Sequence, residues 1–253
     1  MMRLFSVVIQ VVAILLLFLI PGDRRGSFVQ GDTWLTQAQE EINRREYLPS
    51  LQTKDSRGNA FAEPVRHFAN RAQNLRSYIS PDGWRLEPRA KNNTKSPWTW
   101  LYTLESVSRD TSTPLSFSRP DSKEITAEAG TVSIDRHILT EWYKNSKAGI
   151  EQGFTIAERP EGDGRLNLSA KISTDLTVSS TSKDRVVFNT NHAAVLTLGG
   201  LKVTDANDKV LDAGFIYDNR HATLAISIDD RSAVYPILVD PVAASPNWTA
   251  DPT

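Results

Sequence analysis

Apolar and polar side chains alternate with a period of two along much of the chain after Leu75. In residues 98–105 this alternation places four large side chains on one face of an extended segment: Trp98, Trp100, Tyr102 and Leu104. The same period over residues 166–172 and 224–228, together with the strand-like run 233–241, predicts that six side chains are buried: Leu166, Leu168, Leu224, Ile226, Ile228 and Ile237. Turn signals separate the runs, and strands do not alternate with helices. The pattern therefore predicts an antiparallel β-sandwich over residues 65–241, mostly strand from Leu75 to Asp240.

Turn and helix signals divide the chain further. Residues 81–83 (Pro-Asp-Gly) predict a tight turn, and residues 205–208 (Asp-Ala-Asn-Asp) predict a hairpin connection. Residues 33–48 have apolar residues near helical spacing and charges that can pair across turns, which predicts a short N-terminal helix. Residues 52–59 are polar and end in a turn cluster, which predicts a loop. Elsewhere only residues 138–145 have a pattern that favours a helix.

The N-terminus has the pattern of a targeting segment. Arg3 ends a short cationic start, residues 4–20 are apolar apart from Ser6 and Gln10, and a Pro-Gly pair follows. This pattern is typical of a secretory signal, and the small residues nearby place the mature start near Asp32. An uncleaved anchor is the alternative, because an apolar run of this length is at the short limit for crossing a bilayer. We expect export to the medium or cell envelope, with residues 1–31 as signal peptide or N-terminal anchor.

The composition fits one globular domain with appendages. The 253 residues have a net charge of −1 and are 40% hydrophobic, which is sufficient for a sizeable core. Charges of both signs are interspersed, so no basic stripe indicates a nucleic-acid partner. The chain has no cysteine, which excludes disulfides and thiolate metal sites.

Histidine and serine residues lack the neighbours that metal binding or nucleophilic catalysis needs. The four histidines are far apart and in no metal-ligand spacing, which favours structural or surface roles: His67, His137, His192 and His221. Three serines lack the Gly-x-Ser-x-Gly pattern of a hydrolase: Ser80, Ser116 and Ser133. We predict no catalytic residue, no metal and no cofactor.

Residues 205–208 admit a second interpretation, as a metal site. Asp205, Asn207 and Asp208 offer oxygen atoms that Ca²⁺ can use. The segment lacks the central glycine and the distal glutamate of a calcium loop. An Asx-rich turn explains the same residues and is favoured.

Glu141 and Glu151 are the only pair for which we weigh a role as catalytic acid and base. They lie beside aromatic residues and glycines, and a glycan-active enzyme would need both carboxyl groups in one cleft, about 5–9.5 Å apart. The favoured alternative assigns the apolar neighbours to the core and the glycines to turns: Trp142, Tyr143, Ile150 and Phe154. A carbohydrate-binding module is a further alternative, because sandwiches bind glycans through exposed aromatic side chains, for which four tryptophans are available: Trp84, Trp98, Trp100 and Trp142.

Six segments, taken in order, carry a resemblance to a known family. They are residues 46–47 (Glu-Tyr), 69–76 (Ala-Asn-Arg-Ala-Gln-Asn-Leu-Arg), 141–145 (Glu-Trp-Tyr-Lys-Asn), 149–156 (Gly-Ile-Glu-Gln-Gly-Phe-Thr-Ile), 199–206 (Gly-Gly-Leu-Lys-Val-Thr-Asp-Ala) and 235–241 (Tyr-Pro-Ile-Leu-Val-Asp-Pro). The set resembles the N-terminal region of large exported bacterial proteins that carry FG-GAP (integrin-α-like) β-propeller repeats. In such proteins a segment like residues 245–250 leads into the first blade. This chain contains no such repeat, so the calcium-binding and adhesive properties of the propeller are not carried over.

The resemblance implies a non-enzymatic, exported structural or interaction module, with residues 32–64 as helix and loop and residues 65–241 as the sandwich. Residues 242–253 are expected to be a linker toward an absent C-terminal propeller, which would make this chain a truncated copy or a fragment that ends at the domain boundary. We expect residues 245–253 to be poorly ordered and not packed on the sandwich, because two prolines disfavour helix and strand there. The expected partner is a cell-surface protein or a glycan, and the membrane is contacted only through an uncleaved N-terminal segment.

Overall fold

A computed structural model describes residues 31–89, 98–110, 112–191 and 193–246. Contacts divide the chain into two compact units, Met1–Ile42 and Asn43–Thr253. Helix α1 (Gly31–Glu46) spans this division and confirms the helix predicted over residues 33–48. Its side chains Trp34 and Leu35 are exposed. The targeting pattern of residues 1–31 lies outside the described residues except for its last position.

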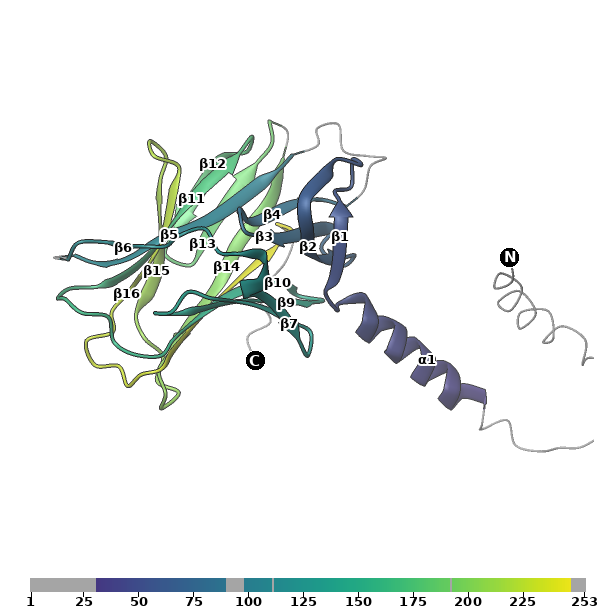
Figure 1. Ribbon diagram of the computed structural model, residues 1–253, viewed down its shortest axis with the longest axis horizontal. Coiled ribbons are helices and arrows are strands. Elements are labelled where there is room, and N and C mark those ends of the chain that lie inside the picture. Colours follow the sequence, from purple (N-terminus) through teal and green to yellow (C-terminus); the bar gives the residue numbers. More distant parts are fainter. Residues whose placement is uncertain (1–30, 90–97, 111, 192, 247–253) are drawn as a thin grey trace, which may run out of the picture. The chain divides into compact units, whose positions relative to one another are not determined.

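Two antiparallel sheets make up the described part of the second unit, which confirms the predicted fold class (Figure 1). Sheet A has, in spatial order, β1 (Ser50–Lys54), β2 (Ala60–Asn70), β3 (Leu75–Ser80), β4 (Gly83–Pro88), β5 (Trp100–Arg109), β11 (Leu166–Thr174), β16 (Thr223–Ile228) and β15 (Ala213–Asp218). The two-residue β6 (Leu115–Ser116) pairs with the far end of β5. The 3₁₀ helix η1 (Ser122–Glu124) follows β6 and is closed at its start by a capping box from Asp121.

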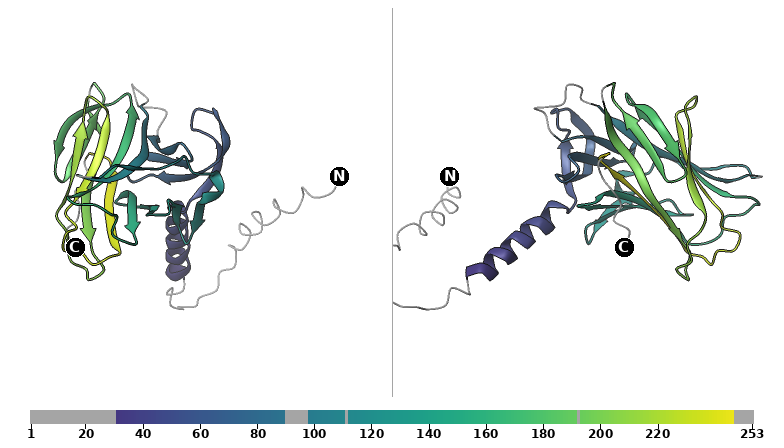
Figure 2. Two further views of the ribbon diagram at one scale, coloured as in Figure 1. Left: turned by 60° about the vertical axis from the view of Figure 1, so that its left-hand side comes forward. Right: turned by 180° about the vertical axis from the view of Figure 1, so that it is seen from behind.

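Sheet B has, in spatial order, β12 (Thr177–Ser182), β13 (Arg185–Asn189), β14 (Ala194–Thr204), β17 (Ile237–Ala244), β10 (Gly149–Ile156), β9 (Thr140–Ser146), β8 (Thr131–Asp135) and β7 (Ile125–Glu128). The last strand, β17, therefore lies in the interior of the sheet, between β14 and β10 (Figure 2). A strand in this position has both edges paired, which fixes the path of the chain up to Ala244.

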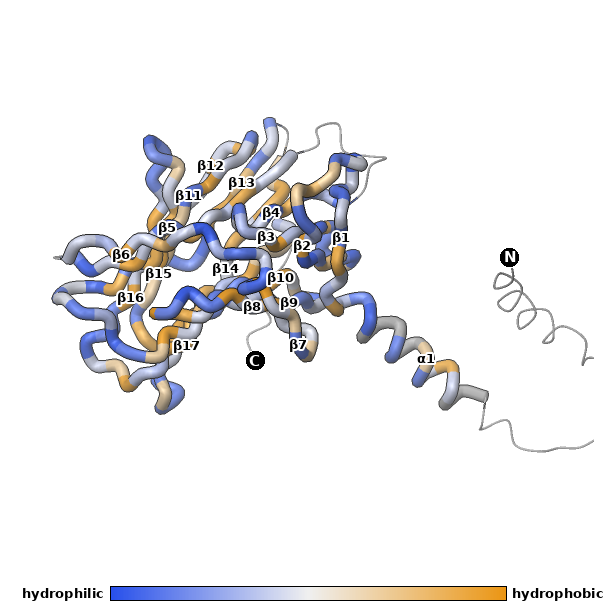
Figure 3. Tube along the Cα trace, viewed as in Figure 1, coloured by the Kyte–Doolittle hydropathy of each residue, from blue (hydrophilic) through white to orange (hydrophobic). Residues whose placement is uncertain are grey.

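The core lies between the two sheets and contains the apolar side chains of the period-two pattern. Apolar and polar positions alternate along the strands (Figure 3), and all six side chains predicted to be buried are at most 4% exposed. Aromatic rings join the sheets: Trp84 of sheet A is 5.4 Å from Tyr143 of sheet B, and Trp100 is 5.7 Å from Phe188. Such ring pairs stabilise the fold beyond the area that they bury, by about 0.5–1.5 kcal/mol each.

Three predicted boundaries are wrong. Gln52–Lys54 belongs to β1 and not to a loop, although the turn cluster after it is present, with Asp55 accepting hydrogen bonds from the Arg57 and Asn59 amides. The segment 138–145 forms most of β9 and not a helix. The sandwich extends from Ser50 to Ala244, beyond the predicted limits of 65 and 241.

The predicted turns are confirmed. Ser80 pairs with Gly83 across the turn formed by residues 81–82, and Gly83 has φ 128°, which favours glycine. No described helix is long and apolar enough to cross a membrane.

The sandwich has two ends, which hold different groups. We call the end with Arg109, Ile156 and Ile228 the mouth end, because segments 112–114, 136–139 and 157–165 meet there. The opposite end contains the β2–β3 turn, the β9–β10 turn and the last residues of β17. We call it the exit end.

Candidate functional site

A cavity with a volume of about 580 Å³ opens at the mouth end. Its apolar wall includes Val107 and Leu115 of sheet A and Ile138 between β8 and β9. Its polar wall includes His137 and Arg159 from two loops of sheet B. This volume is within the range of pockets that take small molecules or a few residues of a partner.

A buried ion pair adjoins this cavity, because one of its two members, Arg109, also lines the cavity. Arg109 and Asp230 are both fully buried, and the Arg109 guanidinium donates two parallel hydrogen bonds of 2.8 and 2.6 Å to the Asp230 carboxylate. Tyr235 also donates to this carboxylate, and Arg109 donates to the carbonyls of Pro160 and Gly164 at 2.9 and 3.0 Å. Burial opposes ionisation, but the hydrogen bonds from Arg109 and Tyr235 hold the pKa of Asp230 below its usual value. The pair therefore joins the end of β5 to two loops of the mouth end, residues 157–165 and 229–236.

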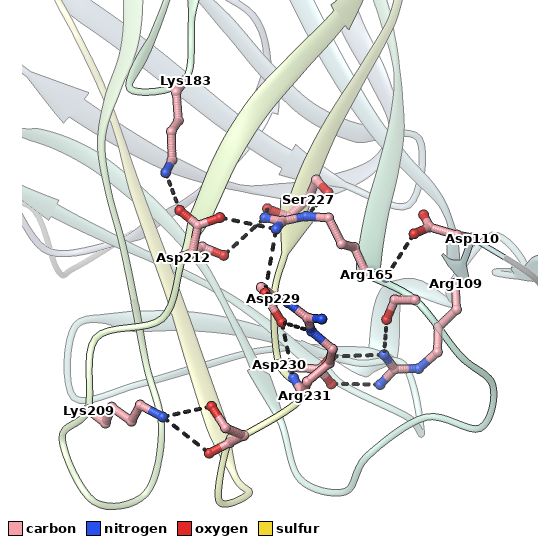
Figure 4. A network of polar contacts seen from close by, with 12 residues as sticks. Arg109, Asp110, Arg165, Lys183, Lys209, Asp212, Ser227, Asp229, Asp230 and Arg231 are labelled. Carbon is pink, nitrogen blue, oxygen red and sulfur yellow. Dashed lines mark hydrogen bonds and ion pairs between the residues drawn. The ribbon is translucent and has the colours of Figure 1, made fainter.

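A second, more exposed set of ion pairs lies near the Arg109–Asp230 pair (Figure 4). The Arg165 guanidinium donates to Ser227 Oγ at 2.9 Å and to Asp212 at 3.1 Å, and Lys183 reaches the same Asp212. Arg231 donates to Asp229, and this hydrogen bond lowers the pKa of Asp229 to about 2. These pairs connect the start of β11 with the start of β15 and the end of β16, so we assign them to holding loops in place.

Glu141 lies in the interior and is fully engaged by neighbouring donors. It is 1% exposed, and one carboxylate oxygen accepts from Arg136 Nε and Nη2 at 3.1 and 2.7 Å. The other oxygen accepts from Gln152 Nε2 at 2.9 Å and from the Tyr143 hydroxyl. Burial and the adjacent carboxylate raise the pKa of Tyr143 well above its usual value. The arrangement is a paired buried charge.

Glu151 lies on the opposite face of sheet B from Glu141. Glu141 is directly opposite Phe154, whose side chain is in the core, whereas Glu151 is opposite Lys144 on the outward face. Side chains on opposite faces of one sheet do not share a cleft. The acid–base pair that a glycan-active enzyme needs is therefore not formed by these two residues.

The four tryptophans considered for glycan binding are all buried, at 1%, 3%, 0% and 7% exposure for Trp84, Trp98, Trp100 and Trp142. The first three belong to the core cluster. Trp142 lies on the outward face of sheet B, where its ring covers Gly153 so closely that a Cβ at that glycine would be 2.0 Å from the ring. None of them offers an exposed aromatic platform. Gly153 thus serves a close contact within a strand and not a turn as predicted, and Trp142 is buried but outside the core.

Outward-facing residues from four of the six motif segments form one row across sheet B. Trp142 is opposite Gly153, and Lys202 is opposite Asp240 on the next strand pair. The register of β10 and β17 places Gly153 beside Asp240. Asp240 has a buried Oδ1 without a hydrogen-bond partner, and burial raises its pKa to about 6, with a further increase from Glu151.

The exit end is held by a cluster of three side-chain amides and one serine, which we call the exit clamp: Asn70, Gln73, Asn145 and Ser245. Gln73 Oε1 accepts hydrogen bonds from the Ser245 backbone N–H at 3.0 Å and from its hydroxyl at 2.7 Å, while Nε2 donates to the Lys147 carbonyl at 3.0 Å. Asn70 Nδ2 donates to Asn145 Oδ1 and to the Ser146 carbonyl, both at 2.8 Å. The clamp joins sheet A to sheet B and to the residue after β17.

The clamp corrects the predicted tail. Val242–Ala244 belongs to β17, Ala243 and Ala244 are buried, and Ser245 is hydrogen-bonded to the sandwich, so the linker predicted from residue 242 begins later. Residues 247–253 lie outside the described residues. No local sequence pattern indicates this clamp, because Gln73 and Ser245 are 172 positions apart.

The remaining candidate residues take structural positions. His67 is buried and 3.3 Å from the Ser50 hydroxyl. Asp205 accepts from the amides of Asn207, Lys209 and Val234, which confirms the interpretation of an Asx-rich turn. Among the residues that the structure describes, we find no group of three or more His, Cys, Asp or Glu able to hold a metal ion.

His137 lines the mouth cavity and His221 is exposed beside Asp218, whereas His192 is outside the described residues. Ser80, Ser116 and Ser133 lie in or at the ends of three different strands, β3, β6 and β8. The structure therefore does not bring these serines and histidines together as a catalytic group.

Comparisons with family models, with curated proteins and with solved structures find no match to this chain.

Proposed function

We propose that this chain is a non-enzymatic, exported structural and interaction module that precedes an FG-GAP β-propeller in a longer protein. The exit clamp is the observation that carries this proposal. Gln73 and Asn145 belong to two of the segments on which the family resemblance rests, and they hold the chain at the point where it leaves the sandwich. A domain attached after Ser245 would leave from a fixed position.

The use of charged residues in the interior supports a structural role. Glu141 is neutralised by Arg136, and Asp230 is neutralised by Arg109, so these buried charges hold strands and loops together. Catalytic acids and bases need an open face toward a substrate, whereas each of these carboxylates is surrounded by protein donors. The mouth cavity, at the other end from the clamp, is the place where we expect a partner to bind.

The direct test is to read the coding DNA downstream of the codon for Thr253. The proposal predicts FG-GAP blades there, either in frame or after a frameshift that accounts for a truncated copy. Downstream DNA without any propeller remnant, in this and in related genomes that encode the same six segments, would refute the assignment to propeller proteins.

A further inference from the structure

The outward face of β2, β3 and β4 carries a concentration of buried nitrogen atoms without hydrogen-bond partners. Eight buried side-chain polar atoms lack a partner among the described residues, and five of the eight belong to four side chains on this face: His67, Arg76, Arg85 and Arg89. We call these four residues the arginine cluster. Buried donors are nearly always paired in proteins, so such a concentration needs an explanation.

Register places the members of the cluster next to one another. His67 on β2 is opposite Tyr78 on β3, which is opposite Arg85 on β4. In the next row Arg76 is opposite Glu87, so Arg76 lies between Arg85 and Arg89 along the neighbouring strand. The alternation of β4 directs Trp84 and Leu86 into the core and the odd-numbered residues outward.

Aromatic stacking holds part of the cluster rigidly. The Arg85 guanidinium lies 4.7 Å from the Tyr78 ring and 5.1 Å from the Phe61 ring, and the Tyr78 ring lies 4.9 Å from the His67 ring. Half-burial leaves Arg85 in contact with solvent, with 26% of its side chain exposed. A preorganised guanidinium that solvent still reaches is suited to bind an anion without a large entropic cost.

The carboxylates near the cluster are already engaged. Glu87 accepts a hydrogen bond from the Tyr78 hydroxyl at 3.0 Å and forms no ion pair within 4 Å with a described residue. Asp55 accepts three hydrogen bonds within its own turn and forms an ion pair with Arg85, whose Nη2 lies 3.6 Å from Asp55 Oδ2 without a hydrogen bond. Three arginines therefore face two committed carboxylates, which leaves a positive balance. The Arg76 charge also contributes, after burial, to a lowered pKa of His67.

We propose that this face binds a tetrahedral oxyanion, phosphate or sulfate, through Arg76, Arg85 and Arg89. The donors come from two strands and from three guanidinium groups, so an anion with four oxygens can satisfy more of them than a carboxylate with two. The proposal is independent of the role assigned to the exit clamp.

Isothermal titration calorimetry with sodium phosphate and with sodium sulfate tests the site, at pH 7 and at an ionic strength held constant with NaCl. We expect saturable binding of phosphate, sulfate or both by the wild-type chain. Arg76→Gln and Arg89→Gln each remove one charge-assisted hydrogen bond to the anion. Each substitution should therefore raise the dissociation constant by about tenfold or more. Arg85 is left unchanged because it is stacked between rings.

The control is Arg220→Gln, in the exposed turn after β15, which should leave binding as in the wild type. Circular dichroism and the melting temperature of each variant establish that it is folded. Absence of saturable binding up to millimolar anion would overturn the proposal. So would binding that is unchanged in Arg76→Gln and Arg89→Gln, or equal binding of acetate.

Discussion

Two carboxylates in the interior of the sandwich are each paired with an arginine. Glu141 with Arg136 and Asp230 with Arg109 are both nearly inaccessible to water. Taking two charges out of water is costly, so such pairs contribute little net stability, but removal of one partner leaves an uncompensated charge. A substitution of one partner should therefore lower the free energy of unfolding much more than a substitution of both partners.

Arg136→Met should therefore lower the free energy of unfolding by about 3–5 kcal/mol, because Glu141 is left buried and unpaired. The double variant Arg136→Met with Glu141→Gln should recover part of this loss. Urea denaturation followed by tryptophan fluorescence measures both. A loss below about 1 kcal/mol in the single variant would show that Glu141 is not held as described.

His67 and Asp240 predict opposite pH dependences of stability. Burial, with the Arg76 charge, lowers the pKa of His67 from 6.5 to about 4, so the unfolded chain binds more protons in this window and His67 stabilises the fold as pH rises through it. Burial, with Glu151, raises the pKa of Asp240 from 3.8 to about 6, although Lys144 and Lys202 oppose this. The folded chain then binds more protons between these values, and this contribution is lost as pH rises toward 6.

The two contributions, each on the order of 2 kcal/mol, largely cancel in the wild type between pH 4 and 6. In a plot of unfolding free energy against pH, His67→Gln should make the slope more negative than in the wild type, because the contribution that rises with pH is removed. Asp240→Asn should make the slope more positive, because the contribution that falls with pH is removed. Denaturant titrations at pH 4, 5 and 6 compare the slopes with that of the wild type. Parallel slopes in all three proteins would contradict both environments.

At the scale of strands, β9 and β10 are in close contact where Trp142 lies opposite Gly153. The Trp142 ring covers Gly153, and Lys144 Nζ lies 4.8 Å from the ring centroid. The strand therefore accepts no side chain at Gly153 without movement of the ring.

Gly153→Ala should destabilise the sandwich by about 1–3 kcal/mol, the usual cost of overpacking. In combination with Trp142→Ala the same substitution should cost much less, since the ring that it meets is gone. A double-mutant cycle in chemical denaturation measures this coupling. Additive losses would mean that the two residues are not in contact.

Some elements could be predicted from the sequence and others could not, for identifiable reasons. Along most of β5, β11 and β16, fully buried residues alternate with less buried ones, so period two is visible in them. β1 is exposed on both faces and shows no alternation. In β9 the consecutive residues Glu141, Trp142 and Tyr143 are all buried, which conceals the period. The cavity and the exit clamp join loops that are distant along the chain, which no local pattern reports.

At the scale of the whole molecule, the two ends of the sandwich differ in structure. The mouth end has a cavity lined in part by Arg109, which is paired with Asp230. At the exit end, Gln73 in the β2–β3 turn of sheet A accepts a hydrogen bond from Ser245, the residue after the last strand. The position of β17 between two paired neighbours makes the exit part of the core structure.

Export of this chain should remove residues 1–31, as the cationic start and apolar run predict. Intact-mass analysis of the protein recovered from the medium or the envelope should give a chain that begins near Asp32. Recovery only in membranes, with Met1 retained, would instead favour an anchor.

Hydrogen exchange at the Ser245 amide tests the fixed exit most directly. In the wild type we predict protection of this amide, because it donates to Gln73 Oε1 at 3.0 Å, and loss of protection in Gln73→Leu. Gln52→Leu in β1 is the matched control and should leave Ser245 protected. A Ser245 amide that exchanges in the wild type as fast as in an unfolded peptide would contradict the clamp, and with it the proposal that this module holds a following domain in a defined position.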